Sequence, residues 1–180
     1  MTGEERHWLT INRAPVLTLW AAVVAERLGF DRDEALTLGR AVAGLNAYSK
    51  GKSLGLFSPT PEDVRKKRKE AREREGFSID LLQRAVPAAQ TADGLRALSK
   101  DKPVKPDSVQ KYLESKFGDA LDDATDAMRM LAQSVSADEL GRVGFRLYEE
   151  FRPEIPSGTK GWGAKGRLDL DKIRSMAETG

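Results

Sequence analysis

The stretch APVLTLWAAVVAERLGFDRDEALTLGRAVAGLNAY, residues 14–48, decides the fold. It predicts two helices joined at Gly29. Pro15 stands where the first turn of a helix tolerates a residue without an N–H, and Gly29 is a typical helix stop. Asp31 followed three residues later by Glu34 has the spacing of a capping box, which marks the start of the second helix. The first helix offers a broad apolar face, made of Val16, Leu19, Trp20, Val23, Val24 and Leu28.

Small side chains recur at every fourth residue of the second helix, at Ala35, Gly39, Ala43 and Ala47. This spacing places them on one face of the helix. A row of small side chains lets two helix backbones approach closely, so we predict that residues 14–48 fold into a tight helical hairpin. This hairpin is the expected nucleus of the fold.

The remaining helices are predicted from their start and stop signals. Thr60 and Pro61 open a strongly charged helix that runs from Glu62 to about Glu75. In the C-terminal half, similar signals and apolar spacing predict helices at 107–117, 119–135, 136–152 and 169–178. No strand-like alternation is long enough to indicate a sheet.

The sequence therefore predicts an all-α fold, a single compact helical domain over residues 1–180 with about six to eight helices. Residues 51–61, which contain two glycines and two prolines, are expected to be a linker. Residues 99–106 are expected to be a proline-broken connector within the same domain.

Composition excludes several classes of chemistry. The chain has no cysteine, so disulfides, thiolate catalysis and cysteine-based metal sites are excluded. His7 is the one histidine, and its place near the terminus argues against a Ser-His pair or a histidine-bound metal. The longest uncharged run, residues 14–25, is shorter than the about 20 apolar residues of a membrane span. We find no typical secretory signal, so the expected location is the cytoplasm, and no cofactor or membrane partner is predicted.

Cations are concentrated in the middle of the chain, within the helix predicted at 62–75. Two interpretations stand for this run. It is either a solvated helix with ion pairs at four-residue spacing, such as Lys66–Glu70, or a surface that contacts phosphates. The candidate phosphate contacts are Arg65, Lys66, Lys67, Arg68, Lys69 and Arg72.

The segment SGTKGWGAKGR, residues 157–167, combines glycines, cations and a tryptophan without a single acid. Glycines make regular structure costly, so residues 155–167 are predicted to form a flexible basic loop. Such a loop is suited to close over an anionic ligand, or to be a surface loop whose tryptophan anchors it to the core. The candidate binding residues are Lys160, Trp162, Lys165 and Arg167.

Asp122, Asp123 and Asp126 form D-D-x-x-D, a spacing found in magnesium sites that hold a diphosphate. Helical spacing brings these carboxylates near one another. Such a site needs a second acidic cluster, which is not visible in the sequence. Acids are also favoured in the first turns of a helix by its dipole, and this explanation is sufficient without a metal.

These observations leave two main functions open. The first, which the sequence favours, is a non-enzymatic helical scaffold or protein-interaction domain that self-associates as a homodimer, with the charged helix giving solubility and the small-residue row giving packing. The alternative is a nucleic-acid or polyanion-binding protein that uses the cationic residues 65–74 and the loop 157–167. The aspartate cluster supplies a third, enzymatic alternative.

Overall fold

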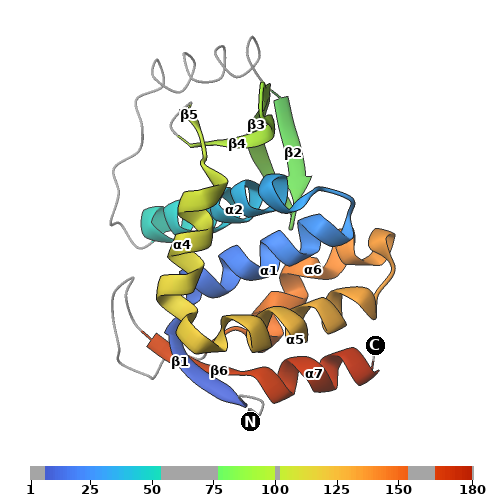
Figure 1. Cartoon of the computed structure of the whole chain (residues 1–180). Coiled ribbons are helices and arrows are strands. Elements are labelled where there is room, and N and C mark those ends of the chain that lie inside the picture. The colour runs from blue at the N-terminus through green and yellow to red at the C-terminus, as the bar shows by residue number, and fades with distance from the viewer. Residues whose placement is uncertain (1–6, 54–76, 100–101, 154–164, 180) are drawn as a thin grey trace.

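A computed structural model of the chain describes residues 7–53, 77–99, 102–153 and 165–179. Figure 1 shows their arrangement. The elements in chain order are β1 (Trp8–Asn12), α1 (Arg13–Arg27), α2 (Arg32–Ser53), β2 (Phe77–Leu81), β3 (Arg84–Thr91), β4 (Gly94–Ser99), β5 (Lys102–Pro103), α4 (Pro106–Phe117), the 3-10 helix η1 (Gly118–Ala120), α5 (Leu121–Gln133), α6 (Ala137–Phe151), β6 (Lys165–Asp169) and α7 (Leu170–Thr179).

The prediction of an all-α fold with six to eight helices is wrong. Strands form 23% of the described residues and build two antiparallel sheets, so the fold is mixed α/β. One sheet is a four-stranded meander in the order β2-β3-β4-β5, and the other pairs β1 with β6. The helices predicted in the C-terminal half are confirmed as α4, α5, α6 and α7. The charged helix predicted at 62–75 lies outside the described residues.

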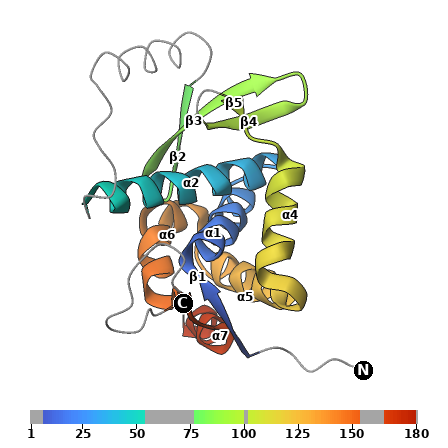
Figure 2. The same ribbon diagram turned by 90° about the vertical axis from the view of Figure 1, so that its left-hand side faces the viewer.

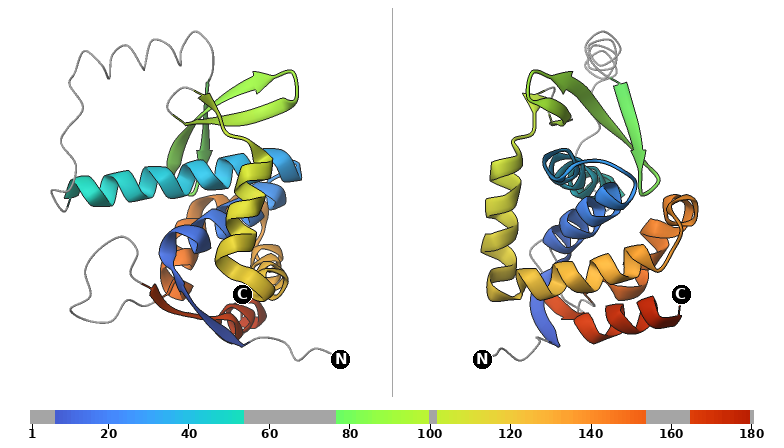
Figure 3. Two further views of the ribbon diagram at one scale, coloured as in Figure 1. Left: turned by 60° about the vertical axis from the view of Figure 1, so that its left-hand side comes forward. Right: turned by 45° about the vertical axis from the view of Figure 1, so that its right-hand side comes forward.

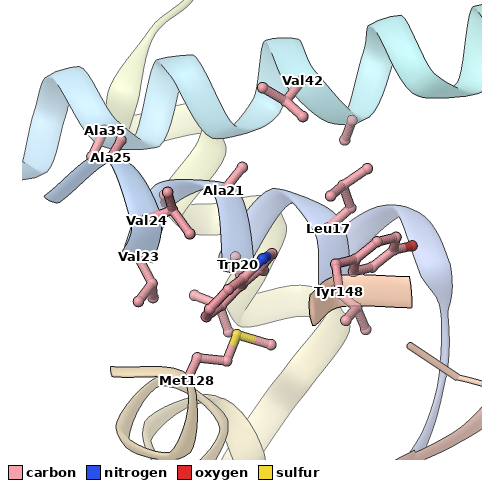
Figure 4. Packing of buried hydrophobic residues seen from close by; sticks show 14 of the residues in the cluster. Leu17, Trp20, Ala21, Val23, Val24, Ala25, Ala35, Val42, Met128 and Tyr148 are labelled. Carbon is pink, nitrogen blue, oxygen red and sulfur yellow. The ribbon is translucent and has the colours of Figure 1, made fainter. Parts of the chain in front are cut away.

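Helix α1 is the centre of the molecule. Every residue from Pro15 to Ala25 is buried, so no face of this part of the helix is left for solvent. In Figure 1, α2 lies on one side of α1, and α5 and α6 lie on the other. Figure 4 shows Trp20 directed from α1 toward Met128 of α5. The Trp20 ring also meets the ring of Phe151 edge-on, with 5.3 Å between centroids.

The predicted helical hairpin of residues 14–48 is confirmed, and Gly39 shows how closely α1 and α2 pack. A Cβ atom at Gly39 would lie 2.5 Å from the carbonyl oxygen of Thr18 and 2.9 Å from the amide nitrogen of Ala22. Both distances are far below van der Waals contact, so a larger residue fits here only if α1 moves. Ala35, from the same row of small side chains, lies at this interface in Figure 4.

Side chains at the start of α2 cap the first turn of this helix and also accept hydrogen bonds from the meander. The meander covers the side of α2 away from α1 (Figure 3). The predicted capping box is formed: the Glu34 amide donates to Asp31 Oδ1 (2.8 Å), and the Asp31 amide donates to Glu34 Oε1 (3.1 Å). Glu34 Oε2 also accepts the amide of Leu95 on β4 (3.3 Å). Two residues farther along β4, the Ala97 amide donates to the Thr37 hydroxyl (3.0 Å). Side chains of α2 therefore satisfy amides of β4.

The β2–β3 hairpin turns through Leu82 and Gln83, which both have positive φ (51° and 62°). That conformation costs roughly 1–2 kcal/mol for each residue with a side chain. Contacts with α6 offset the cost: Leu82 is buried against Gly144, and the Gln83 side-chain amide donates to the carbonyl of Arg142 (3.2 Å). Trp20 Nε1 donates to the carbonyl of Gly144 (2.9 Å), so the core helix and the hairpin tip meet α6 at the same residue.

Two features of the sequence explain why the meander was not predicted. The β2–β3 turn lacks the glycine, asparagine or aspartate that normally occupies positions with positive φ, although the β3–β4 turn carries Asp93 and Gly94. Pro87, which has no amide hydrogen, stands within β3 and argues against an inner strand. In the structure, Pro87 pairs with Ser78 of β2, and pairing between β3 and β4 begins only at the next residue, Ala88. Proline is therefore placed where the ladder with β4 has not yet begun.

The segments predicted as connections contain regular structure. Helix α2 continues to Ser53, so the linker predicted at 51–61 begins inside a helix, and the rest of that segment lies outside the described residues. The connector predicted at 99–106 includes β5, which pairs with the end of β4. The basic loop predicted at 155–167 ends in β6, so residues 165–167 are strand rather than loop.

Candidate functional site

The first and last strands of the chain meet in the β1–β6 ribbon. Figure 2 shows β1 in front, next to α7. The strands are antiparallel, with Trp8 opposite Asp169 and Thr10 opposite Arg167. Alternate residues point inward, so that Leu9, Ile11 and Leu168 are buried in the core. The outward face presents Trp8, Thr10, Lys165 and Arg167, all exposed, together with the partly buried Asn12 and Asp169, of which Asp169 stands directly opposite Trp8.

Arg167 and Trp8 form a cation–π pair on this outward face. The guanidinium carbon of Arg167 lies 4.5 Å from the centre of the Trp8 ring. Arg167 is the diagonal neighbour of Trp8 across the ribbon, a position that long side chains reach. Trp8 is 48% exposed, whereas Trp20 in α1 is fully buried. An exposed pair of this kind contributes only about 0.5–1 kcal/mol to the stability of the fold. Stability alone therefore does not account for a tryptophan at this exposed position.

Among the residues that the structure describes, no carboxylate forms an ion pair with the two outward cations of β6. The ion pairs formed among the described residues involve neither Lys165 nor Arg167. Asp169 lies on the same strand, but its Oδ1 accepts the amide of Lys172 (3.2 Å) and so caps the start of α7. The positive charge of Lys165 and Arg167 is therefore available to a ligand.

The carboxylate of Asp171, at the start of α7, is held by the side chains of His7 and Arg174. His7 Nδ1 donates to one oxygen (2.8 Å), and Arg174 Nη1 donates to the other (2.9 Å). The hydrogen bond from His7, followed by that from Arg174, lowers the pKa of Asp171 below its ordinary value. The Leu170 amide donates to the carbonyl of His7 (2.8 Å), which continues the ribbon by one residue.

A second cluster of cations around an aromatic ring lies where α2 meets α4. The guanidinium carbon of Arg40 is 4.6 Å from the centre of the Tyr112 ring, and Lys116 Nζ is 6.0 Å from it. Tyr112 is partly buried, and desolvation raises the pKa of its hydroxyl despite the opposing charge of Arg40. This cluster ties two helices together and offers less open ring than Trp8 does.

The sequence-predicted binding residues are only partly described. Lys165 and Arg167 lie on the outward face of β6. Arg167 lies beside Trp8, whereas Lys165 stands opposite Asn12, toward the other end of the ribbon. Lys160 and Trp162 lie outside the described residues. So do the cations of the predicted charged helix, Arg65, Lys66, Lys67, Arg68, Lys69 and Arg72. That the two basic stretches converge on one side of the molecule therefore stays a prediction.

Sequence reasoning missed two residues of this region, Trp8 and His7. The signal that could have found Trp8 is the alternation W-L-T-I-N over residues 8–12, which places Trp8 and Thr10 on one face of a strand. Five residues are too few to separate this pattern from chance. His7 is recognised only through its contact with Asp171, which lies at the other end of the chain.

The aspartate cluster does not assemble into a metal site in the described geometry. Asp122 and Asp123 lie in the first turn of α5, and both Asp122 and Asp126 are exposed. Within the part of the chain that the structure describes, no group of three carboxylate or histidine side chains could hold a metal ion. The helix dipole accounts for acids at this position.

Two further findings bear on function. None of the helices in the described ranges is both long and apolar enough to cross a bilayer. No protein-family model, curated protein or solved structure matches this chain. The geometry of the β1–β6 ribbon is therefore the basis for a functional proposal.

Proposed function

We propose that this protein binds a polyanion such as a nucleic acid, without catalysis and in the cytoplasm, through the outward face of the β1–β6 ribbon. The carrying observation is the Arg167 guanidinium placed over the half-exposed ring of Trp8, with Lys165 on the same face. A guanidinium presents planar, paired donors that match phosphate oxygens, and a lysine adds a point charge.

Local charge supports the proposal. Residues 165–174 carry four cations, Lys165, Arg167, Lys172 and Arg174, against two carboxylates, so their formal charge is +4 − 2 = +2. Both carboxylates are engaged, Asp169 at the start of α7 and Asp171 with His7 and Arg174. A phosphate that approaches the outward face of β6 therefore meets a positive field.

The alternative of a self-associating scaffold loses support. Ala35, Gly39 and Ala43, three of the four residues of the small-residue row, are buried within the chain, with Gly39 packed against α1, while the side chain of Ala47 lies outside the described residues. They are therefore not offered to a second copy. Among the described residues, the large apolar side chains with substantial exposure are Trp8 and Met130, which is little apolar area for a stable dimer.

The test measures how salt affects the affinity for a labelled oligonucleotide. The logarithm of the binding constant should fall linearly with the logarithm of salt concentration. In the double variant Lys165→Ala/Arg167→Ala, the affinity should fall, and for a single strand the salt slope should decrease by about 1.4, since each phosphate contact contributes about 0.7.

A matched control removes the same charges elsewhere. Lys102 on β5 and Arg146 on α6 are exposed, and the ion pairs among the described residues involve neither. The double variant Lys102→Ala/Arg146→Ala should keep the affinity and salt slope of the unmodified protein. Equal losses in the two double variants would show that only overall charge matters, and absence of any binding at low salt would refute the proposal.

A further inference from the structure

We infer that the polyanion is a single-stranded nucleic acid, with an unpaired base stacked on Trp8. This inference rests on the proposed function and names the class of ligand that the same site takes. Phosphate attraction alone does not separate a single strand from a duplex, because both carry a charged backbone. The feature that separates them is the aromatic ring.

The strand that carries Trp8 is held in place by its buried residues. The neighbouring residue of β1, Leu9, is buried, as is Ile11 two residues farther on, and these anchors hold the strand against the core. The next outward residue of β1 is Thr10, a small side chain that leaves room beside the ring. Arg167 lies over the ring at 4.5 Å, yet 48% of Trp8 stays exposed. A ring held in this way is ready to stack with little loss of freedom on binding.

Stacking on Trp8 requires a base with a free face. In a duplex, each base is already stacked between its neighbours, and freeing it costs a few kcal/mol. In a single strand the bases can splay apart, and stacking on aromatic side chains is a common and sequence-tolerant way to bind them. Trp8 therefore adds affinity for single strands that a duplex does not gain.

The spacing of the cations on β6 suits contact with the phosphate backbone of the bound single-stranded nucleic acid. Lys165 and Arg167 are two residues apart on one face of β6, which separates them by about 6.6 Å along the strand. This separation lets them reach different phosphates. Arg167 also contacts the Trp8 ring, so the base-stacking residue and a phosphate-binding residue are neighbours.

The Tyr112 cluster supplies an internal comparison. Arg40 lies over Tyr112 at 4.6 Å, nearly the distance found between Arg167 and Trp8. Tyr112, however, is partly buried between helices, whereas Trp8 stands on an outward face. If cation–aromatic pairing alone made a site, both clusters would bind, but exposure of the ring favours Trp8.

The experiment compares four probes: oligo-dT, oligo-rU, a DNA duplex of the same length, and inorganic polyphosphate. For the unmodified protein we expect tighter binding of a single strand than of the duplex. Trp8→Leu should weaken single-strand binding about 10-fold or more, because stacking is lost, and leave the salt slope unchanged. Its affinity for duplex and for polyphosphate should not change. The tighter of the two single strands identifies DNA or RNA as the source.

Two further variants serve as controls for this experiment. Trp8→Phe keeps an aromatic ring and should retain most of the single-strand affinity even if the leucine variant folds poorly. Tyr112→Leu should leave single-strand affinity unchanged. In a Trp162→Phe background, oligo-dT should quench the emission of Trp8, since Trp20 is buried.

The possible outcomes distinguish a failure of the single-strand inference from a failure of the proposed polyanion binding. Equal affinity for single strands and duplex, with no selective loss in Trp8→Leu, overturns the single-strand inference and leaves polyanion binding in place. Failure of all four probes to bind at low salt overturns the proposed function itself.

Discussion

The α1–α2 hairpin and the β1–β6 ribbon join their elements in contrasting ways. The hairpin connects neighbouring segments across the turn at Gly29, and small side chains around Gly39 bring its two helix backbones close together. The ribbon connects strands from opposite ends of the chain and buries only one of its faces. Its other face exposes Trp8 and Arg167 to solvent.

Because of this difference, we expect substitutions in the hairpin to change stability and substitutions on the outward face of the ribbon to change ligand binding. Atoms at Gly39 have no space in which to move, so a change there acts on folding. Side chains on the outward face of the ribbon make few contacts, so a change there acts on ligand binding and alters folding little. The predictions below test this separation, from the largest effect on stability to the smallest.

Gly39→Ala should produce the largest effect. The new Cβ would lie 2.5 Å from the carbonyl oxygen of Thr18, an atom of the α1 backbone that cannot rotate away. The two helices must separate, and we expect a loss of about 3 kcal/mol in the free energy of unfolding, measured by urea denaturation.

Gly44→Ala is the control on the same helix. Apart from its own stretch of helix, no atom of the described residues lies within 4 Å of a Cβ built at Gly44. Replacing an exposed helical glycine with alanine should stabilise the protein by about 0.5–1 kcal/mol. If the two alanine variants proved equally stable, the close packing of α1 on α2 would be refuted.

Asp31→Ala should have an intermediate effect, because it removes the side-chain half of the capping box. The Glu34 amide then loses its acceptor at 2.8 Å. We expect a loss of about 1 kcal/mol in the free energy of unfolding. Asp31→Asn, which keeps an acceptor oxygen, should lose much less, and an equal loss in both variants would show that the hydrogen bond to the Glu34 amide is not the source of the stabilisation.

Acid should affect the ribbon end of the molecule slightly. The pKa of Asp171 is lowered in the folded state, chiefly by the hydrogen bond from His7, so folding favours the charged carboxylate. Its stabilising contribution is complete above the ordinary pKa of 3.8 and is lost as pH falls through the lowered value. The effect is small because the group is exposed.

Thermal unfolding of the unmodified protein and of Asp171→Asn should therefore be compared in acid. The difference between their melting temperatures should be largest near neutral pH and shrink below about pH 4. A constant difference throughout this range would show that the contact between His7 and Asp171 does not stabilise the ribbon.

Helix starts and the stop at Gly29 were predictable because their signals are local, whereas the end of α2 at Ser53 was not. The Asp31–Glu34 capping box and the stop at Gly29 are present as expected. Ser136 caps α6, with the Glu139 amide donating to its hydroxyl (3.2 Å). Each of these interactions involves residues within one helical turn, so sequence spacing alone reveals it.

The strands were not predictable in the same way. Leu82 and Gln83 adopt positive φ without glycine, a conformation that only contacts with α6 make tolerable. The β1 and β6 strands are five residues long, and each requires the other as a partner. Short strands gain stability from pairing and burial, which are not visible in either segment by itself.

The candidate site shows the same division. Lys165 and Arg167 were found because cations in an acid-free segment are recognisable from composition. Trp8 was missed because it becomes part of the site only when β1 pairs with β6. Which aromatic ring the cations meet is a property of the register between these strands.

Capping, periodicity and the row of small residues were sufficient to specify the central helical hairpin, since each acts between residues that are close in the chain. Folding alone decided that residues 8–12 and 165–169 pair, which face of each strand looks outward, and that Trp8 lies under Arg167. The physical reason is distance along the chain. A pairing between its two ends depends on everything packed between them, above all on the buried helix α1.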